Sequence, residues 1–368
     1  MTLKLEILKR PSADPYDNFF KTCSHGLIQQ SVLWSDVISP LSPDIPYFLI
    51  VKDRDENVLG GIPVYYFKTD LGAILTSVPH AGPLGGILCK KDCDEILKKQ
   101  IYSELIQGAI NLAKELNCIS LTIITNPFLS DAEFYSQPVH PDYIFNNFCQ
   151  IIDLHNLFPE NDSYYSEKSG YTIDRNVRRN LKKASENKVS VEWATEADFE
   201  EWYSIHVKRH TELGAEPLPR ALLINILGIL SKLNMAGLVV AKLNNRIAGG
   251  CIFVWNKEVA DAYILSSDSD YTEYGINHAI TDFAVRYFHE KGFRWFNWQG
   301  CTRDSGVYRF KQSWGGIEKT YRFLTWTFDG FQNIFSYNFE DIPREYKWHY
   351  VAPFEAIKNK CRSGLFNK

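Results

Sequence analysis

The apolar and polar positions of this chain follow the same order in two segments. Residues 47–67 (YFLIVKDRDENVLGGIPVYYF) and 238–255 (LVVAKLNNRIAGGCIFVW) each run from a β-rich apolar stretch through a polar turn into a second β-rich stretch. This order predicts two β-hairpins, with turns at residues 53–57 and 244–246. A Gly-Gly step stands near the start of the second strand of each hairpin. Because glycine weakens a strand, such a pair marks a bulge or the close approach of another group.

A helical pattern and a further strand follow each hairpin. The predicted elements are a helix at about 98–116 and a strand at 119–125 in the first half, and a helix at about 276–291, closed by Gly292, and a strand at 293–298 in the second. The sequence therefore predicts one α/β unit used twice, with Gly60-Gly61 and Gly249-Gly250 at equivalent places. The alternative is chance recurrence, since this order of elements is common.

The length of the chain also favours two domains. At roughly 150 residues per domain, 368 residues exceed one ordinary core. A polar, helix-poor stretch at about 154–170 suits a linker. We therefore expect domains at 1–155 and 156–330, followed by a tail at 331–368 that the sequence alone does not place.

Composition and charge exclude several classes of protein. Hydrophobic residues make up 45% and charged residues 23%, which indicates a folded chain, and the net charge of −4 excludes a globally basic nucleic-acid binder. Eight cysteines show neither a Cys-x-x-Cys pair nor a metal-ligand spacing, so we expect reduced, mostly buried thiols and no metal. The first twenty residues lack the apolar run of a signal peptide, and the most apolar stretch, 221–230, is about half a membrane span. These features predict a soluble, cytoplasmic protein without membrane insertion.

The clearest local signal is a cationic helical face within residues 173–188 (IDRNVRRNLKKASENK). Six basic and two acidic residues lie between positions 174 and 188. At about 100° per residue, five cations fall on one face and four apolar residues on the other. The cations are Arg175, Arg178, Arg179, Lys182 and Lys183, and the apolar residues are Ile173, Val177, Leu181 and Ala184. Such a stripe predicts a site for phosphate groups or another polyanion, the alternative being a solvated helix face.

A second candidate site is the glycine-rich segment 298–316 (WQGCTRDSGVYRFKQSWGG), which follows a predicted strand. Gly300 and Gly306 can expose backbone N–H groups, and Arg303, Arg309 and Lys311 supply positive charge. Such a segment could bind an anionic substrate or stabilise an oxyanion. It could equally be an ordinary surface loop.

Other residues with reactive side chains have simpler interpretations. His206 and His210 are four apart on a predicted helix, but no third metal ligand is evident. His80 and His278 could each act as a general base or be structural. Cys301 has no nearby base in the sequence to activate it.

The order of these features resembles the FemAB-like branch of the GNAT acyltransferases. The resemblance is carried by the basic helix, the Ala-Gly-Gly hairpin, the helix and strand that follow, and the motif Asp-Ser-Gly-x-Tyr-Arg-Phe-Lys-x-x-Trp-Gly at residues 304–315. It covers about 173–321 well and the first half more weakly, at 30–37 and 79–83. It implies an α/β fold (α+β, GNAT-like) of two tandem GNAT-like domains, each a mixed twisted sheet flanked by helices.

The resemblance also implies a reaction and its residues. It points to N-acyl transfer, with acyl-CoA as donor, to an amine of a small molecule such as an amino sugar or nucleotide sugar. The alternatives are an aminoacyl-tRNA-dependent ligase of peptidoglycan type, with tRNA as a partner, and a non-catalytic binding protein. Phe310 and Lys311 would lie by the transferred acyl group, with Tyr308 as a proton donor. The cationic stripe, Arg303 and Arg309 would hold phosphate.

This chain departs from the family pattern at two places that bear on the donor. The usual GNAT pyrophosphate loop reads Arg/Gln-x-x-Gly-x-Gly/Ala, whereas residues 269–277 (SDYTEYGIN) contain only Gly275. The helical-hairpin insertion of some peptidoglycan enzymes is also missing. The sequence therefore leaves the donor open between a coenzyme A thioester and an aminoacyl-tRNA.

Overall fold

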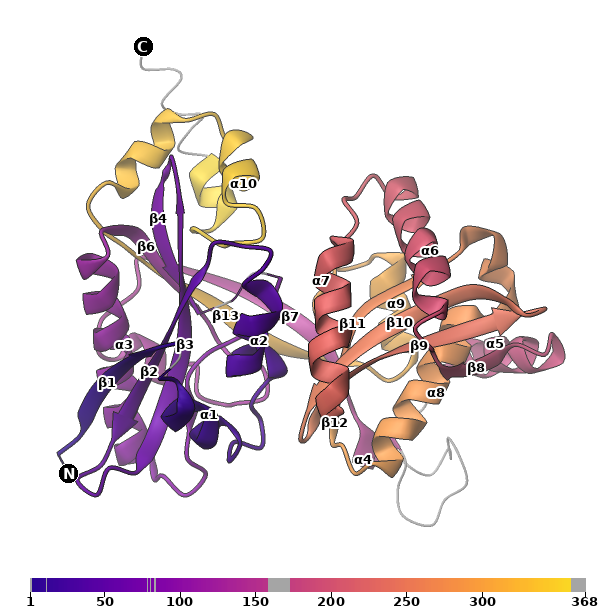
Figure 1. Ribbon diagram of the computed structural model, residues 1–368, viewed down its shortest axis with the longest axis horizontal. Coiled ribbons are helices and arrows are strands. Elements are labelled where there is room, and N and C mark those ends of the chain that lie inside the picture. The colour runs from indigo at the N-terminus through magenta and orange to yellow at the C-terminus, as the bar shows by residue number, and fades with distance from the viewer. Residues whose placement is uncertain are drawn as a thin grey trace. The chain divides into compact units, whose positions relative to one another are not determined.

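The computed structural model describes residues 2–10, 12–77, 79, 81–82, 84–157 and 173–358, and the chain divides into two compact units (Figure 1). Unit 1 comprises Met1–Asn147 and Thr320–Lys368, and unit 2 comprises Phe148–Lys319. Each unit is an α/β structure built on a mixed sheet, which confirms the predicted fold class.

Unit 1 contains a sheet with the strand order β1-β2-β3-β4-β6-β13. All neighbours are antiparallel except β4 and β6, which are parallel because helix α3 crosses between them. The elements are β1 (Lys4–Lys9), α1 (Asp14–Phe20), α2 (Val32–Ile38), β2 (Ile45–Lys52), β3 (Val58–Thr69), β4 (Gly72–Thr76), β5 (Leu88–Cys89), α3 (Glu95–Glu115), β6 (Cys118–Ile124), β13 (Ile317–Thr327) and α10 (Asp341–Glu345).

Unit 2 contains a sheet with the order β8-β9-β10-β11-β12-β7. Again one neighbouring pair is parallel, β11 with β12, and helix α8 connects them. The elements are β7 (Tyr143–Asp153), α4 (Leu154–Leu157), α5 (Arg175–Glu186), β8 (Ser190–Trp193), α6 (Asp198–Glu212), α7 (Arg220–Asn225), β9 (Ala236–Leu243), β10 (Arg246–Asn256), β11 (Val259–Ser267), η6 (Ser269–Tyr274), α8 (Ile276–Glu290), β12 (Trp295–Asn297) and α9 (Gly306–Ser313).

The glycine pairs occupy equivalent positions in the two units, as the repeated pattern predicts. Gly60 lies in β3 against α3, where an added Cβ would be 2.4 Å from Ile101 Cγ2, and Gly249 lies in β10 against α8, where it would be 3.0 Å from Ile276 Cγ2. The close approach of a helix therefore explains Gly60, while at Gly249 helix α8 acts together with Ser267 of β11, whose Cβ would lie 2.8 Å from the added Cβ. The predicted duplication is confirmed in element order, strand pairing and glycine position.

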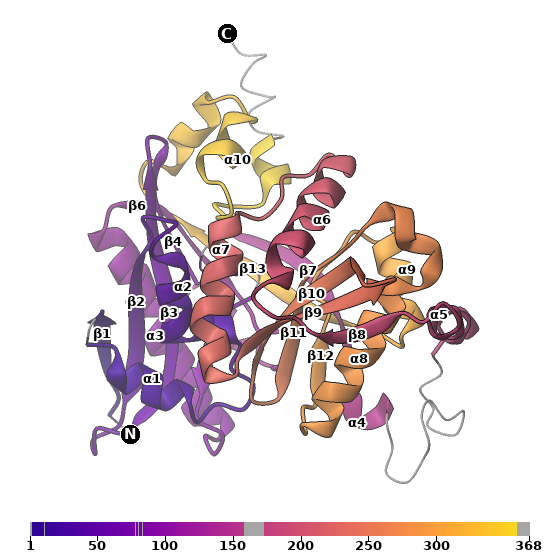
Figure 2. The same ribbon diagram turned by 45° about the vertical axis from the view of Figure 1, so that its right-hand side comes forward.

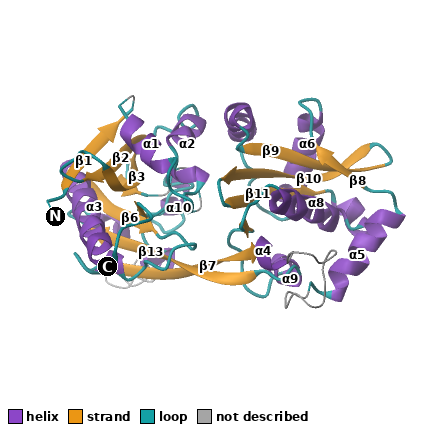
Figure 3. Ribbon diagram, turned by 90° about the horizontal axis from the view of Figure 1, so that it is seen from below, coloured by secondary structure: helices purple, strands orange, loops and turns teal. Residues whose placement is uncertain are grey.

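The second glycine of each pair faces a helix on the opposite side of the sheet. A Cβ on Gly61 would be 3.1 Å from the ring of Tyr16 in α1, and one on Gly250 would be 2.7 Å from Cδ1 of Trp202 in α6. Successive residues of a strand face opposite sides, so α3 and α1 cover opposite faces in unit 1, as do α8 and α6 in unit 2 (Figure 3).

Each sheet takes its last strand from a distant part of the sequence. In unit 1, β13 pairs with β6 through Phe323↔Ile124 to Thr327↔Ser120. In unit 2, β7 pairs with β12 through Trp295↔Asp153. The chain therefore passes between the units twice, at 147–148 and at 319–320.

This division differs from the expected ranges 1–155 and 156–330. Polar composition marks surface segments, whereas strand pairing decides to which unit a strand belongs. The expected linker at 154–170 lies largely outside the described residues. The expected tail belongs to unit 1, where Phe331, Ile334 and Tyr346 pack with Ile74 and Ile119.

Two further predictions concern the cysteines and the membrane. All seven cysteines in the described ranges are free, and five of them are buried, as expected. Cys361 lies outside those ranges. Among the described residues, every helix is too short or too polar to cross a membrane.

Candidate active site

Helix α5 carries the cationic stripe on its exposed face. The Asn176 backbone N–H donates to Asp174 Oδ1 at 2.7 Å and so caps the helix. Val177 and Ala184 are buried on the inner face, and Lys182 makes an exposed ion pair with Glu186 at 3.7 Å. The five cations at 175, 178, 179, 182 and 183 are all exposed. The predicted one-sided distribution is confirmed, while its binding role stays a prediction.

The motif segment forms a helix where a loop was considered. Ser305 caps α9, since its side chain accepts from the Tyr308 N–H at 3.0 Å. A Cβ at Gly306 would meet nothing within 4 Å, so no close contact requires that glycine. The left-handed backbone positions here are Gln299, Asp304 and Gly315, with φ of 58°, 60° and 79°.

Lys311 lies inside unit 2 and is only 6% exposed. Its Nζ donates to the carbonyl oxygens of Trp298 at 2.7 Å, Gln299 at 3.1 Å and Gly300 at 3.1 Å. Burial lowers the pKa of this ammonium group. Because an ammonium has three protons, this one has none left for an oxyanion. Lys311 therefore holds the backbone after β12, which differs from the expected direct contact with the acyl group.

The hydrogen bonds of Lys311 orient two peptide groups so that their N–H groups face away from the lysine. In a trans peptide the C=O and the following N–H point in opposite directions. The carbonyls of Gln299 and Gly300 point at Nζ, so the N–H groups of Gly300 and Cys301 point away from it. Neither N–H has a hydrogen-bond partner among the described residues. They form a pair of adjacent free donors.

A buried polar chain fixes this backbone from the sheet side. Asn297 Nδ2 donates to Asp261 Oδ1 at 2.5 Å, and the Gln299 N–H donates to Asn297 Oδ1 at 2.9 Å. Gln150 of β7 accepts from Cys301 Sγ at 3.3 Å and donates to the Tyr308 carbonyl at 3.4 Å. Sequence reasoning missed Gln150, Asp261 and Asn297, because strand pairing alone brings them to the motif.

The remaining motif side chains are engaged with one another. Tyr308 donates its hydroxyl proton to Glu318 at 2.8 Å, which raises the pKa of the phenol. Arg303 pairs with the same carboxylate at 2.7 Å and lies 4.4 Å over the Phe148 ring. Arg309 donates to the Asp304 carbonyl at 3.0 Å. The expected roles of Tyr308, Arg303 and Arg309 therefore compete with existing contacts.

His278, one of the two histidines considered as bases, packs beside the motif helix. Its ring lies 5.0 Å from Phe310, edge to face, and 6.2 Å from Trp314. Burial lowers its pKa to about 4, so the imidazole is neutral near pH 7. Its ring nitrogens have no hydrogen-bond partner within the described ranges. His80, the other candidate, lies outside those ranges.

The histidine pair of α6 has a structural role. His206 is completely buried, its Nε2 accepts from the Leu218 N–H at 3.0 Å, and its Nδ1 lies 2.9 Å from Ser266 Oγ. His210 Nδ1 lies 3.2 Å from the Glu216 carbonyl oxygen. In the part of the chain that is described, no three His, Cys, Asp or Glu side chains gather as metal ligands would.

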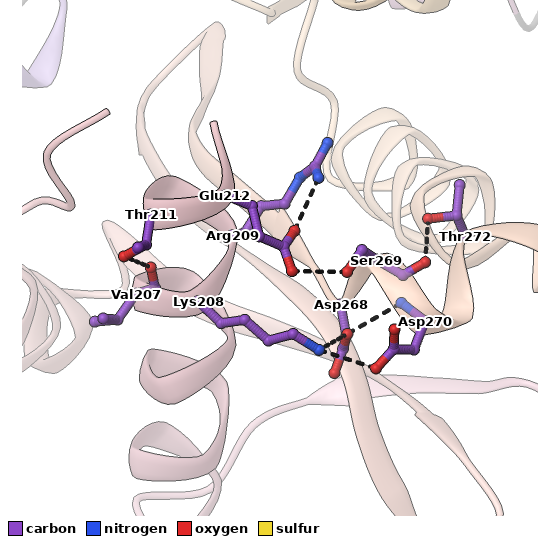
Figure 4. Close-up of polar contacts among 9 residues, drawn as sticks. All are labelled: Val207, Lys208, Arg209, Thr211, Glu212, Asp268, Ser269, Asp270 and Thr272. Carbon is purple, nitrogen blue, oxygen red and sulfur yellow. Dashed lines mark hydrogen bonds and ion pairs between the residues drawn. The ribbon is translucent and has the colours of Figure 1, made fainter. Parts of the chain in front are cut away.

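The segment before α8, where GNAT domains bind the coenzyme A pyrophosphate, is acidic and tied to α6 (Figure 4). Lys208 Nζ lies 2.7 Å from Asp268 Oδ1 and 2.9 Å from Asp270 Oδ2. Ser269 Oγ donates to Glu212 at 2.8 Å. These contacts place carboxylates where a pyrophosphate would need cations and backbone donors.

Helix α5 also covers the N-terminus of α8 (Figure 2). Gly275, the N-cap residue, has φ of 74°. Its Cα approaches the Asn180 carbonyl so closely that an added Cβ would be 2.4 Å from the oxygen. The residues present therefore do not fit a coenzyme A pyrophosphate at this helix end.

Comparisons with known proteins agree with the fold and with the motif region. Residues 173–312 match the family model of the acetyltransferase (GNAT) domain. The structure of FemX superposes with a TM-score of 0.67 at 12% identity and covers 90% of this chain and 99% of that chain.

Two further solved structures share the fold. A tandem GNAT protein from the clavulanic acid biosynthesis pathway has a TM-score of 0.51 at 12% identity and covers 89% of this chain and 99% of that chain. The C-terminal domain of a putative lysylphosphatidylglycerol synthetase from Agrobacterium fabrum has a TM-score of 0.52 at 10% identity and covers 84% and 92%. No curated protein sequence matches this chain.

Proposed function

We propose that this chain transfers an acyl group to an amine. The match of residues 173–312 to the GNAT acetyltransferase domain and the tandem GNAT fold support this proposal and agree with the resemblance seen in the sequence. The observation that carries the proposal is the pair of free N–H groups at Gly300 and Cys301, held outward by Lys311. Preorganised backbone donors of this kind stabilise the oxyanion of acyl transfer.

The reaction follows from these groups. The amine nitrogen attacks the acyl carbonyl carbon, and the carbonyl electron pair moves onto the oxygen, where the two N–H groups donate to it. Neutral His278 accepts the proton that the amine loses. The tetrahedral adduct then collapses, the bond from carbon to the leaving group breaks, and the imidazolium returns the proton to the leaving atom. Phe310 contacts both His278 and Trp298, with centroid distances of 5.0 Å and 5.7 Å, and Trp298 begins the segment that carries the oxyanion donors.

We favour a donor with an extended phosphate backbone over an acyl-CoA, which the sequence placed first. The usual pyrophosphate position is filled by the Asn180 carbonyl and flanked by Asp268 and Asp270. The exposed cations of α5 instead offer a continuous surface for phosphates. Coenzyme A also carries phosphates, but only a few at one end, whereas aminoacyl-tRNA, the other donor that the family resemblance implies, has a phosphate backbone long enough to follow this surface. We therefore favour aminoacyl-tRNA as donor and a small-molecule amine, such as that of an amino sugar, as acceptor.

Binding measurements separate the donors. In a filter-binding assay, the full chain should bind aminoacyl-tRNA, and the affinity should fall as the salt concentration rises. The Arg178→Ala/Lys182→Ala double variant should bind it at least tenfold more weakly. Lys232→Ala, which removes an exposed lysine of unit 2 away from the stripe, should bind as the parent does.

Acetyl-CoA serves as the competing ligand in the same series. Thermal stabilisation by acetyl-CoA but not by tRNA would reverse the choice of donor. Binding of tRNA that is equal in the double variant and in Lys232→Ala would remove α5 from the donor site. Binding of either ligand without acyl transfer to any amine tested would favour the non-catalytic alternative.

A further inference from the structure

Unit 1 contains a cavity of about 320 Å³ beside the first turns of α3. Its walls come from α3, from the end of β5, from the loop after α1 and from the loop after β6. Leu88, Leu129 and Phe134 make part of the wall apolar, while Asp131 and Lys98 place charges on it. A cavity of this size encloses a ligand of monosaccharide size.

Asp131 lies in the wall of this cavity with one oxygen unpartnered. The residue is 7% exposed, and Tyr102 donates its hydroxyl proton to Oδ2. Oδ1 is fully buried and has no hydrogen-bond partner among the described residues. Burial raises the pKa of this carboxyl group to about 6. A buried carboxylate oxygen without a partner is costly, so a cationic ligand group next to it would be stabilising.

Three lysines supply positive charge to the same cavity. Lys98 is half-buried on α3, one helical turn before Tyr102, and Lys90 and Lys91 are exposed at the end of β5. Within the described ranges, none of these ammonium groups makes a hydrogen bond or an ion pair, including with Asp131. The wall of the cavity therefore carries a buried carboxyl group and three lysines whose ammonium groups make no hydrogen bond or ion pair within the described ranges.

We propose that this cavity binds a small phosphorylated amine, with the ammonium group on Asp131 and the phosphate among Lys90, Lys91 and Lys98. One helical turn separates Lys98 from Tyr102, which is about 6 Å along the axis. Lys98 and the Tyr102–Asp131 pair therefore line one cavity, so a ligand that contacts both must carry its two charges at opposite ends. An amino sugar phosphate does so, whereas the ammonium and carboxylate of a free amino acid lie closer together. This proposal does not depend on the proposed acyl transfer, because a binding measurement without any acyl donor tests it.

Calorimetric titration of the full chain without an acyl donor tests the proposal. Glucosamine 6-phosphate is the probe, and glucosamine, glucose 6-phosphate and inorganic phosphate each lack one of its features. We expect a dissociation constant of about 1 mM or tighter for the probe, and binding at least tenfold weaker for each of the others. Lys98→Ala should weaken binding of the probe about tenfold, because a partly buried phosphate contact is lost.

Matched variants keep the result interpretable. Lys99→Ala removes the neighbouring exposed lysine, which pairs with Glu95 outside the cavity, and should bind the probe as the parent does. Asp131→Asn should weaken the probe about tenfold and leave glucose 6-phosphate unchanged, because only the probe carries an ammonium group. Absence of binding by the parent, equal binding of the probe and glucose 6-phosphate, or equal effects of the two lysine variants would each overturn the proposal.

Discussion

The carbonyl oxygen of Asn180 occupies the space beside Gly275, so that a Cβ at position 275 would lie 2.4 Å from it. Helix α5 thus closes the N-terminus of α8 with its own backbone. Helix α5 therefore has two roles in the structure: its backbone packs against the start of α8, and its exposed face presents the cationic stripe.

Gly275→Ala should destabilise the protein by about 2–4 kcal/mol, because it adds a clash with Asn180 to an unfavourable φ of 74°. Gly292→Ala is the matched control, since Gly292 has φ of 79° but nothing within 4 Å of its added Cβ. It should cost only about 1 kcal/mol. Urea unfolding of the two variants measures the difference. Equal losses of unfolding free energy would mean that the Asn180 carbonyl does not restrict position 275.

Lys311→Met should lower kcat about 10²-fold with little change in KM, because the oxyanion donors lose their support while the substrate contacts remain. Lys311→Arg should recover part of kcat, since guanidinium also donates to carbonyls but with a planar geometry. Gln312→Ala, an exposed neighbour on α9, controls for effects on the helix. Steady-state kinetics provides the test. A rise in KM alone would show instead that Lys311 contacts the substrate.

His206 predicts a loss of stability in acid. Burial lowers its pKa from 6.5 to about 4, so the unfolded state binds the extra proton between these values. The stabilisation is complete above pH 6.5 and is lost as the pH falls toward 4. At pH 5 the loss amounts to about 2 kcal/mol.

The measurement compares the parent with His206→Gln, which does not titrate. The difference in unfolding free energy between the parent and His206→Gln should be about 2 kcal/mol smaller at pH 5 than at pH 8, since the two proteins share all other titrating groups. Curves that stay parallel would contradict a neutral, buried His206.

A fragment cut at the boundary expected from composition should not fold. Residues 1–155 lack β13, so β6 becomes an open edge with unpaired N–H and C=O groups. A fusion of 1–147 to 320–358 through a flexible linker restores that strand and the packing of Phe331 and Ile334. We expect aggregation of the first and cooperative unfolding of the second, measured by size-exclusion chromatography and circular dichroism. A monomeric, cooperatively folded 1–155 fragment would disprove the assignment of β13 to unit 1.

Local patterns predicted much of this structure. The hairpins, the glycine pairs and the inner face of α5 follow from side chains whose spacing matches the period of a strand or a helix. The Gly60 and Gly249 positions could be equated because a helix approaches the glycine closely in both units.

The sequence could not predict contacts that depend on tertiary structure. The partners of Lys311 are backbone carbonyls, which carry no sequence signal, and Gln150 reaches the motif only because β7 pairs with β12. The motif resemblance drew attention to Lys311, but a lysine with three buried acceptors and one that faces a substrate look identical in sequence.

The return of β13 to unit 1 has a consequence in time. Thr122 and Thr325 share a hydrogen bond at 2.9 Å although 203 residues separate them. At the usual pace of protein synthesis, of 5–20 residues per second, roughly 10–40 s pass between the emergence of β6 and that of its partner strand. Throughout that interval the first half of the nascent chain cannot finish its sheet, so its folding must wait until β13 has been synthesised.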